Sequence, residues 1–264
     1  MLYSTRTYRR WGDEQRSAGV RGANRKKRAV SRYYKLLCEG GVSPYAKAQW
    51  PLPSKNEDGT WTPGEWMPAL PGEVVRCRNG YHFCTVDNLP AFLNAELYEL
   101  EVDEGAGVVT WDDKCATTAC CRLVRRIEAW NERSARHFAC DCAERVLPLF
   151  ERERPDDERP RRAIAVARRF ADGEATRGEL AAARCAVWST AECVAWKNAE
   201  RAAWSTAGDA AARAAWDAAG YAAECAAWDT TEGYAAAAAE WSAAYAAERE
   251  WQAQRLFALL GLED

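Results

Sequence analysis

One short stretch in the first half of the chain gathers residues that could hold a metal ion. Cys77, His82 and Cys84 follow the spacing C-x4-H-x-C, and Cys38 could lie near them in the fold. Thiolates and imidazoles are the usual zinc ligands, but this spacing belongs to no standard zinc ribbon or knuckle, and the chain has no C-x-x-C pair. We therefore predict buried thiols and a hydrogen-bonded histidine here, and no metal site.

A second cysteine and histidine pair could be considered for nucleophilic catalysis. His137 and Cys140 stand three residues apart in a stretch predicted to be helical. A cysteine nucleophile also needs an orienting group and an oxyanion site, which a helix surface seldom provides. The chain has neither a glycine-rich phosphate loop nor an H-E-x-x-H or G-x-S-x-G motif. We predict no catalytic residue and no cofactor, and the sequence favours a protein that is not an enzyme.

Aromatic and cationic residues of the first half are better candidates for binding a ligand. Residues 43–72 form a loop rich in proline and tryptophan, and such a loop is expected to pack on something. The Asn79-Gly80 pair between EVVRC and YHFCT predicts a β-hairpin beside it. Indole and phenol rings with an arginine suit a protein or nucleotide-type ligand. The predicted ligand-binding residues are Trp50, Trp61, Trp66, Arg78, Tyr81 and His82.

The charge of the chain is unevenly distributed. Residues 1–32 contain ten Lys or Arg and two acidic residues, so they carry +8, whereas the whole chain carries −3 and the remainder −11. With almost no apolar periodicity, this arm is either a solubilising tail or a segment that contacts phosphates. Its predicted nucleic-acid-binding residues are Arg25, Lys26, Lys27 and Arg28.

The cysteines and the apolar residues bear on location. The first residues contain no apolar h-region, and no apolar stretch is long enough to cross a bilayer. The odd number of cysteines, eleven, argues against a disulfide framework. We therefore expect a reduced, cytoplasmic protein in a bacterial cell, without contact to a membrane.

The pattern along the chain predicts an α+β protein with three parts. A basic arm at residues 1–32 precedes a small α+β domain at 33–130 and a helical domain rich in Ala and Trp at 131–264. YYKLL, LYELEV and two stretches between 107 and 130 read as strands. DNLPAFLN reads as a short helix capped by Asp87 or Asn88.

The helical domain carries recognisable helix ends. Pro148 is expected to kink its first helix. Gly173 is expected to end the next one, and Thr176 with Glu179 forms a capping box for a third. Five tryptophans from Trp188 to Trp228 follow at spacings of 8, 8, 12 and 12, with glycines at a similar period. This pattern predicts a bundle or short solenoid, with one continuous helix as the alternative.

A dense charged loop separates the first two helices of this domain. It contains Asp156, Asp157 and Glu158 together with Arg159, Arg161 and Arg162. Such a loop is usually solvated and supplies helix caps. The alternative is a polar contact patch, in which paired arginines bind a phosphate or carboxylate.

Three sequence words carry a resemblance to a known family. ACDCAERVLPLFE, RPDDERPRRAI and ARRFADGE lie between residues 138 and 174, and EREWQ follows at 248–252. With the Ala/Trp tail, they resemble the Imm5-like immunity domains of actinobacterial and phage proteins. The resemblance covers about half of the chain. It implies a helical fold and a role in neutralising a partner, and it carries over no catalytic residue.

The first half is also similar, in the order of its elements, to small phage-associated domains and to the ADP-ribosyltransferase fold. YYKLL, GYHFCTVDNLPAFLN and LYELEV carry this likeness. That fold needs a catalytic glutamate near its end, whereas Glu99 and Glu101 come too early. A likeness of fold does not establish a reaction.

These observations favour a binding protein that is not an enzyme, acting in phage–host or toxin–immunity conflict. It would capture a protein effector or a nucleotide-type ligand. One alternative is an ADP-ribosyltransferase-like enzyme or an inactive relative. Another is a nucleic-acid-associated or virion structural protein that uses the basic arm. Self-association into a homo-oligomer through the Ala/Trp helices fits all three.

Overall fold

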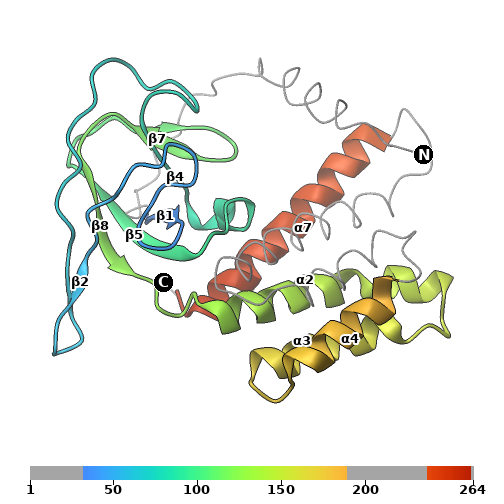
Figure 1. Cartoon of the computed structure of the whole chain (residues 1–264). Helices are drawn as coiled ribbons and strands as arrows, with labels where there is room; N and C mark the ends of the chain where they lie inside the picture. Colours follow the sequence, from blue (N-terminus) through green and yellow to red (C-terminus); the bar gives the residue numbers. More distant parts are fainter. Residues whose placement is uncertain (1–31, 189–236, 263–264) are drawn as a thin grey trace. The chain divides into compact units, whose positions relative to one another are not determined.

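The computed structural model of the chain describes residues 32–188 and 237–262, with strands in the first part and helices in the second (Figure 1). The predicted α+β class is confirmed. The described residues belong to one compact unit. The basic arm, including Arg25 to Arg28, and the tryptophans from Trp196 to Trp228 lie outside the described residues. The choice between a bundle, a solenoid and a continuous helix therefore stays a prediction.

Two small antiparallel sheets form the first part. One has the strand order β1-β5-β8 and the other the order β4-β7-β6. Their edges are linked, because Tyr34 and Cys84 exchange two backbone hydrogen bonds of 2.8 and 3.0 Å. The predicted strands YYKLL and LYELEV are β1 and β5. The bounds are β1 Tyr33–Leu37, β4 Tyr81–Phe83, β5 Glu96–Val102, β6 Val109–Thr110, β7 Cys115–Thr117 and β8 Cys121–Arg126.

The predicted hairpin at Asn79-Gly80 is wrong. β4 pairs with β7, which lies over thirty residues further along the chain, and not with EVVRC. Val75 instead pairs with Asn79 in a tight turn, in which Cys77 has a φ of 60°. Gly80 has a φ of 129° and lies close to the Thr117 carbonyl oxygen, which a Cβ would approach to 3.3 Å. The absence of a side chain at Gly80 thus allows β4 to lie close to β7.

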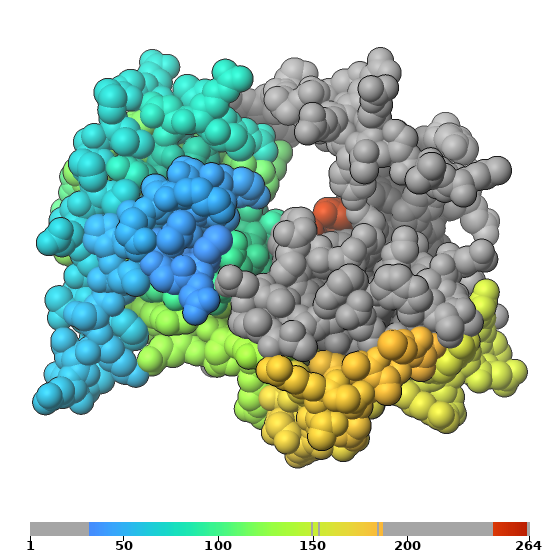
Figure 2. Space-filling view, viewed as in Figure 1, coloured from blue at the N-terminus to red at the C-terminus, as the bar shows by residue number. Residues whose placement is uncertain are grey.

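The loop rich in proline and tryptophan covers the free edge of β8. The N–H groups of Gly64 and Met67 donate to the carbonyls of Leu123 and Cys121 at 2.9 and 2.8 Å. A Cβ at Gly64 would lie 2.3 Å from the Pro51 carbonyl oxygen, so only glycine fits there. The loop therefore packs as expected. Within it, β2 (Ser54–Lys55) and β3 (Trp61–Thr62) form a hairpin that projects from the sheets (Figures 1 and 2).

The predicted short helix is a 3-10 helix, η1 (Val86–Ala91). Its N-cap position is occupied by Thr85 and not by Asp87 or Asn88, so the cap prediction is wrong by two residues or more. Thr85 has extended backbone, and its hydroxyl bonds the Asn88 side chain at 3.1 Å. Asp87 and Asn88, which the sequence suggested as caps, therefore lie inside η1.

The second part is helical. α2 begins after Asn131, whose side chain accepts the N–H groups of Arg133 and Ser134, and it runs on through Pro148. α2 packs on α3, α3 packs on α4, and α7 packs on both η1 and α2. The bounds are α2 Glu132–Glu153, α3 Arg159–Ala171, α4 Arg177–Trp188 and α7 Ala237–Leu260.

Two predicted helix ends are confirmed. Gly173 follows α3 with a φ of 77°, and its N–H donates to the Phe170 carbonyl at 3.1 Å. Such left-handed residues satisfy the last carbonyls of a helix, and glycine adopts them without strain. Before α4, Thr176 Oγ1 accepts the Glu179 N–H at 3.2 Å, and Glu179 Oε2 accepts the Thr176 N–H at 2.7 Å.

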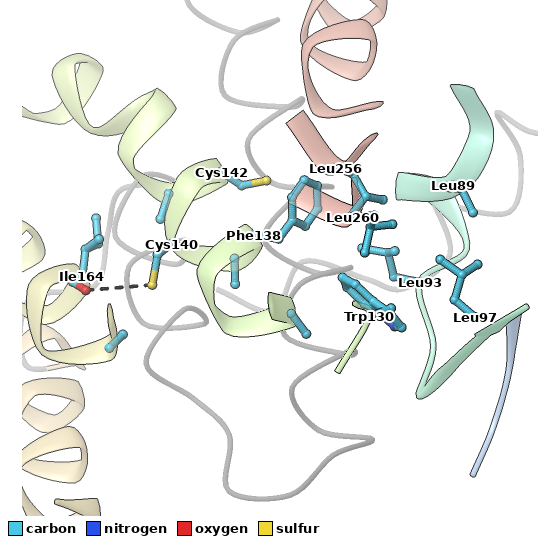
Figure 3. Close-up of a cluster of buried hydrophobic side chains, with 14 of the residues drawn as sticks. Leu89, Leu93, Leu97, Trp130, Phe138, Cys140, Cys142, Ile164, Leu256 and Leu260 are labelled. Carbon is cyan, nitrogen blue, oxygen red and sulfur yellow. Dashed lines mark hydrogen bonds between the residues drawn. The ribbon is translucent and has the colours of Figure 1, made fainter. Parts of the chain in front are cut away.

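One cluster of buried side chains joins the strands to the helices (Figure 3). Trp130 lies between Leu93 and Leu97 on the strand side and Phe138 of α2, with Leu256 of α7 completing the cluster. A second cluster fills the opposite side of the first sheet. Alternation along β1 explains the division, because Tyr34 and Leu36 face the first cluster while Tyr33 and Leu37 face the second.

Candidate functional site

Two of the predicted ligand-binding residues pack together in the second cluster. Trp50 is 3% exposed, and its ring meets that of Tyr81 edge-on at 5.5 Å. The Tyr81 hydroxyl donates to the Pro68 carbonyl at 2.8 Å. These contacts fasten the proline-rich loop to β4.

His82 has both ring nitrogens engaged by the backbone. Nε2 lies 3.0 Å from the N–H of Cys77, so it must accept, and Nδ1 then donates to the Gly80 carbonyl at 2.9 Å. Burial lowers the pKa of His82, and the ammonium groups of Lys114 and Lys35 lower it further, against the opposing effect of the Gly80 carbonyl. A neutral imidazole in one tautomer therefore holds the turn at residues 75–79.

The remaining predicted ligand-binding residues have other neighbours. Trp66 is 40% exposed and stacks on the Arg122 guanidinium at 4.4 Å, whereas Trp61 lies 5.9 Å from the Lys55 ammonium. Arg78 is exposed at the turn beside His82. In the structure Trp50 contacts Tyr81, and His82 is the next residue along β4. Trp66 and Trp61 each lie against a different cation, Arg122 and Lys55. Their role in binding stays a prediction.

Sequence analysis missed Lys35, which lies at the centre of the first group. Its ammonium donates to the His82 carbonyl and lies 5.0 Å from the centre of the Trp50 ring. Burial lowers the pKa of Lys35 to about 8. The sequence did contain a signal for it. Residues two apart in a strand lie on the same face, so Lys35 lies on the same apolar face of β1 as Tyr33 and Leu37.

The cysteines do not form the metal site that was considered. Among residues 32–188 and 237–262, no three histidine, cysteine or acidic side chains lie close enough to hold a metal ion. Cys84 is buried, and burial raises the pKa of its thiol to about 12. Cys140 is likewise buried with a pKa of about 12, and its thiol points to the Ile164 carbonyl (Figure 3). His137 instead contacts Asp172 at 2.9 Å.

The two glutamates weighed for transferase chemistry are held in ion pairs. Glu99 Oε2 accepts the Arg125 Nε–H at 2.6 Å, and Glu101 Oε2 accepts that of Arg122 at 2.8 Å. These pairs cross between β5 and β8, where opposite charges stabilise neighbouring strands. The observed arrangement therefore assigns them a structural role.

Helices α2 and α3 are joined along their length by ion pairs, which we call the ion-pair seam. At one end, Arg133 and His137 of α2 meet Asp172, whose pKa is lowered by the Arg133 hydrogen bond and then by that of His137. At the other end, Glu151 accepts two bonds from Arg161. The seam consists of Arg133, His137, Asp141, Glu144, Glu151, Arg161, Arg168 and Asp172.

Asp141 is the buried centre of this seam. Its Oδ1 accepts from Arg168 of α3 at 2.7 Å, and its Oδ2 accepts from Arg255 of α7 at 2.6 Å. The carboxylate is 7% exposed, whereas the arginine side chains are 27% and 43% exposed. One carboxylate, at the third residue of the word ACDCAERVLPLFE, therefore connects three helices.

Replacing Asp141 with alanine is expected to lower the free energy of unfolding by about 1–3 kcal/mol, less than for a fully buried pair because the arginines are half-exposed. Arg168 keeps Glu144 as a partner at 2.6 Å, while Arg255 loses its contact. Urea unfolding would measure the change. Glu158→Ala is the control, since its pair with Arg162 is 63% and 75% exposed and should contribute about 0–0.5 kcal/mol. Equal losses in both variants would contradict the role of Asp141.

The charged loop between α2 and α3 lines an open hollow of about 620 Å³. Two of its arginines already have carboxylate partners: Arg159 bonds Asp157 through two nitrogens, and Arg162 bonds Glu158. Arginines already paired with carboxylates are poorer ligands for a phosphate, and the polar contact patch stays a prediction. The hollow is lined by Arg154, Pro155, Asp156, Asp157, Glu158, Arg159 and Arg162.

The matched sequence and the described helices coincide. Residues 125–259, slightly more than half of the chain, match the family described as "Imm-5 like putative immunity protein". The chain belongs to this family. The resemblance of the second half is thereby confirmed, and membership fits an immunity-type role that is not enzymatic. No curated protein and no solved structure matches the chain.

The family match includes the end of β8 and every residue of α2, α3 and α4, so the ion-pair seam and the hollow lie inside it. The group around Lys35 lies before it. Within residues 32–188 and 237–262, no helix is long and apolar enough to cross a membrane.

Proposed function

We propose that this member of the family is an immunity-type binding protein that neutralises a protein effector by stoichiometric capture, in toxin–immunity or phage–host conflict. The family match over residues 125–259 is the observation that carries the proposal. The two histidines support it, because the imidazole of His82 serves the backbone and that of His137 serves Asp172.

The effector-binding surface that we favour is the turn between α2 and α3. It lies inside the matched region and presents both signs of charge around an open hollow. Arg161, Arg162 and Glu158 have side chains that are 64%, 75% and 63% exposed. Exposed charges of this kind increase association rates and select a partner of complementary potential, while the ion-pair seam holds α2 and α3 on either side of the turn.

Co-expression tests the capture. Products of genes adjacent to the one for this chain would be expressed in a bacterial host, alone and together with it. We expect that one of these products stops growth when it is expressed alone and that growth recovers when this chain is expressed with it. The two proteins should form a complex of fixed stoichiometry in size-exclusion chromatography. Rescue without a complex would contradict capture. If nucleotides raise the melting temperature of this chain and the candidate effector protein does not, the result would favour a nucleotide-type ligand.

Charge reversals locate the surface. The double variant Arg154→Glu and Arg162→Glu is expected to weaken the complex about tenfold or more and to slow association. Arg78→Glu is the matched control in the first half, at a residue predicted from sequence to bind a ligand. Loss of binding by Arg78→Glu alone would move the surface to the turn beside His82.

The proposal extends to location and assembly. A reduced, cytoplasmic location is supported by nine described cysteines, all of which are free thiols. A homo-oligomer through the Ala/Trp segment is proposed on the sequence pattern. Native mass spectrometry of the protein from host lysate would give its oligomeric mass and any partner that remains bound.

A further inference from the structure

Helix α7 has few large apolar side chains that could fix its position along α2. Nine of its 24 residues are alanine, and small uniform side chains interlock weakly. The large buried apolar side chains in its described part are Leu256 and Leu260, which stand four residues apart. A slip of α7 by one turn, about 6 Å, would therefore place one leucine where the other stood. Apolar packing alone distinguishes poorly between such neighbouring registers.

Polar contacts between α2 and α7 carry opposite signs at successive turns. Asp141 Oδ2 of α2 accepts the Arg255 Nε–H at 2.6 Å, and Glu248 Oε2 of α7 accepts the Arg145 Nε–H at 3.3 Å. We call these two pairs the register contacts. The Arg145 guanidinium also lies 5.1 Å from the centre of the Trp251 ring. An acid and a base of α2 thus meet a base and an acid of α7.

Only one register of α7 satisfies both pairs. After a slip of one turn, the place of Arg255 beside Asp141 would be taken by Leu259 or by Trp251, depending on the direction. The place of Glu248 would likewise hold no acid. Both pairs are therefore lost together when the helix moves by one turn.

The burial of Glu248 makes its contact selective more than stabilising. Its side chain is 3% exposed, and it accepts at 3.3 Å from Gln252, which is fully buried. Burial raises the pKa of Glu248, and the hydrogen bonds from Gln252 and Arg145 oppose this only in part. The pair therefore adds little to stability, whereas a register that breaks it leaves a buried charge without its partner. Setting a register is the best-attested role of such buried polar groups.

The register contacts join two of the sequence words that carry the family resemblance. Asp141 and Arg145 belong to ACDCAERVLPLFE, and Glu248 begins EREWQ. The turn between α2 and α3 accounts for neither word. Because α7 also packs on η1, its register determines where the helices meet the strand part.

We propose that the register contacts fix the axial position of α7 on α2, and with it the position of α7 against η1. A chain that lacks them would keep its helices and its apolar core but would sample several registers of α7. The proposal does not depend on the proposed capture of an effector.

The test replaces the buried polar side chains of α7 in the full chain. Glu248→Leu with Gln252→Leu makes a continuous row of leucines with Leu256 and Leu260. Arg145 is 50% exposed, so it stays solvated when its partner is lost. We expect an unchanged or higher melting temperature, together with α7 amides that exchange with deuterium about tenfold faster.

The indole N–H of Trp251 reports the register in a spectrum of protein labelled with 15N-tryptophan. It should give one signal in the parent and a split or broadened signal in the variant, because Trp251 has different neighbours in each register. Glu158→Leu with Arg162→Leu is the matched control, since this exposed pair lies within α3 and should leave α7 unchanged. One sharp Trp251 signal with parent-like α7 exchange in the leucine variant would overturn the proposal.

Glu248→Gln keeps the shape of the side chain and removes only its charge, so this variant should fold even if the leucine variant does not. Because the pKa of Glu248 is raised by burial, the neutral side chain should increase the melting temperature at pH 7. Loss of the register contact should nevertheless make α7 exchange about threefold faster. Slower α7 exchange, or a lower melting temperature, would assign the contact to stability alone and contradict the proposal.

Discussion

Trp130→Ala is expected to lower the free energy of unfolding by about 3–5 kcal/mol, the range for deleting a large aromatic side chain from a packed core. Trp130 is 1% exposed, and its indole Nε1–H donates to the Asn94 carbonyl at 2.7 Å. The substitution leaves a cavity beside Phe138 and Leu93 and removes the donor to the Asn94 carbonyl (Figure 3). It removes the side chain that joins the strands to α2.

The measurement is urea unfolding followed by far-ultraviolet circular dichroism for the helices and by hydrogen–deuterium exchange of the β1 and β5 amides for the strand part. Because one cluster contains both parts, the two signals should shift together to lower urea. Trp66→Ala is the control, since this indole is 40% exposed and should cost about 1 kcal/mol or less. Separate transitions, with only the helices destabilised, would show that the shared core is not what holds the two parts together.

Lys35→Met is expected to stabilise the protein at pH 7 by about 1–3 kcal/mol. The pKa of Lys35 is about 8 against an ordinary 10.5, and each unit of such a difference corresponds to about 1.4 kcal/mol. Methionine keeps the length of the side chain and removes the buried charge. It also loses the bond to the His82 carbonyl and the contact with Trp50, so the gain is smaller than the shift alone implies.

The pH dependence of this difference has a definite sign. Below pH 8, Lys35 is protonated in both folded and unfolded chains, and the cost of burying its charge is complete. Between pH 8 and 10.5 the unfolded chain binds the extra proton, so the contribution of Lys35 to stability rises with pH and the cost disappears. The advantage of Lys35→Met should therefore be constant below pH 8 and vanish by about pH 10.5.

The Lys35 ammonium lowers the pKa of the buried Cys84 and Cys121 thiols, so these thiols titrate differently in parent and variant, and the effect of Lys35 is measured most directly at or below pH 8. Their raised pKa values reduce stability as the pH rises above their ordinary value of 9.0. Lys55→Met is the matched control, since Lys55 is 45% exposed and should change stability by about 0.5 kcal/mol or less. A destabilised Lys35→Met at pH 7 would mean that the hydrogen bond outweighs the buried charge.

Local features were predictable from sequence because their causes are local. Gly173 ends α3 since only glycine readily takes its backbone angle, and Thr176 with Glu179 caps α4 through residues three apart. Alternating side chains identified β5. The three words between residues 138 and 174 were sufficient to indicate the family.

The candidate sites were less predictable, because their neighbours come from distant parts of the chain. Asn79-Gly80 signals a turn, but only the tertiary structure decides that β4 pairs with β7. Asp141 was one acid among many until α3 and α7 brought Arg168 and Arg255 to it. Arg145 likewise meets Glu248 across 103 residues.

The sequence by itself therefore determined the α+β class, the end of α3, the cap of α4 and the family of this protein. The tertiary structure decided which polar groups are buried and what they contact. The reason is physical: a cap or a turn depends on backbone angles within a few residues, whereas the burial of Lys35 depends on Trp50 and His82 being folded over it.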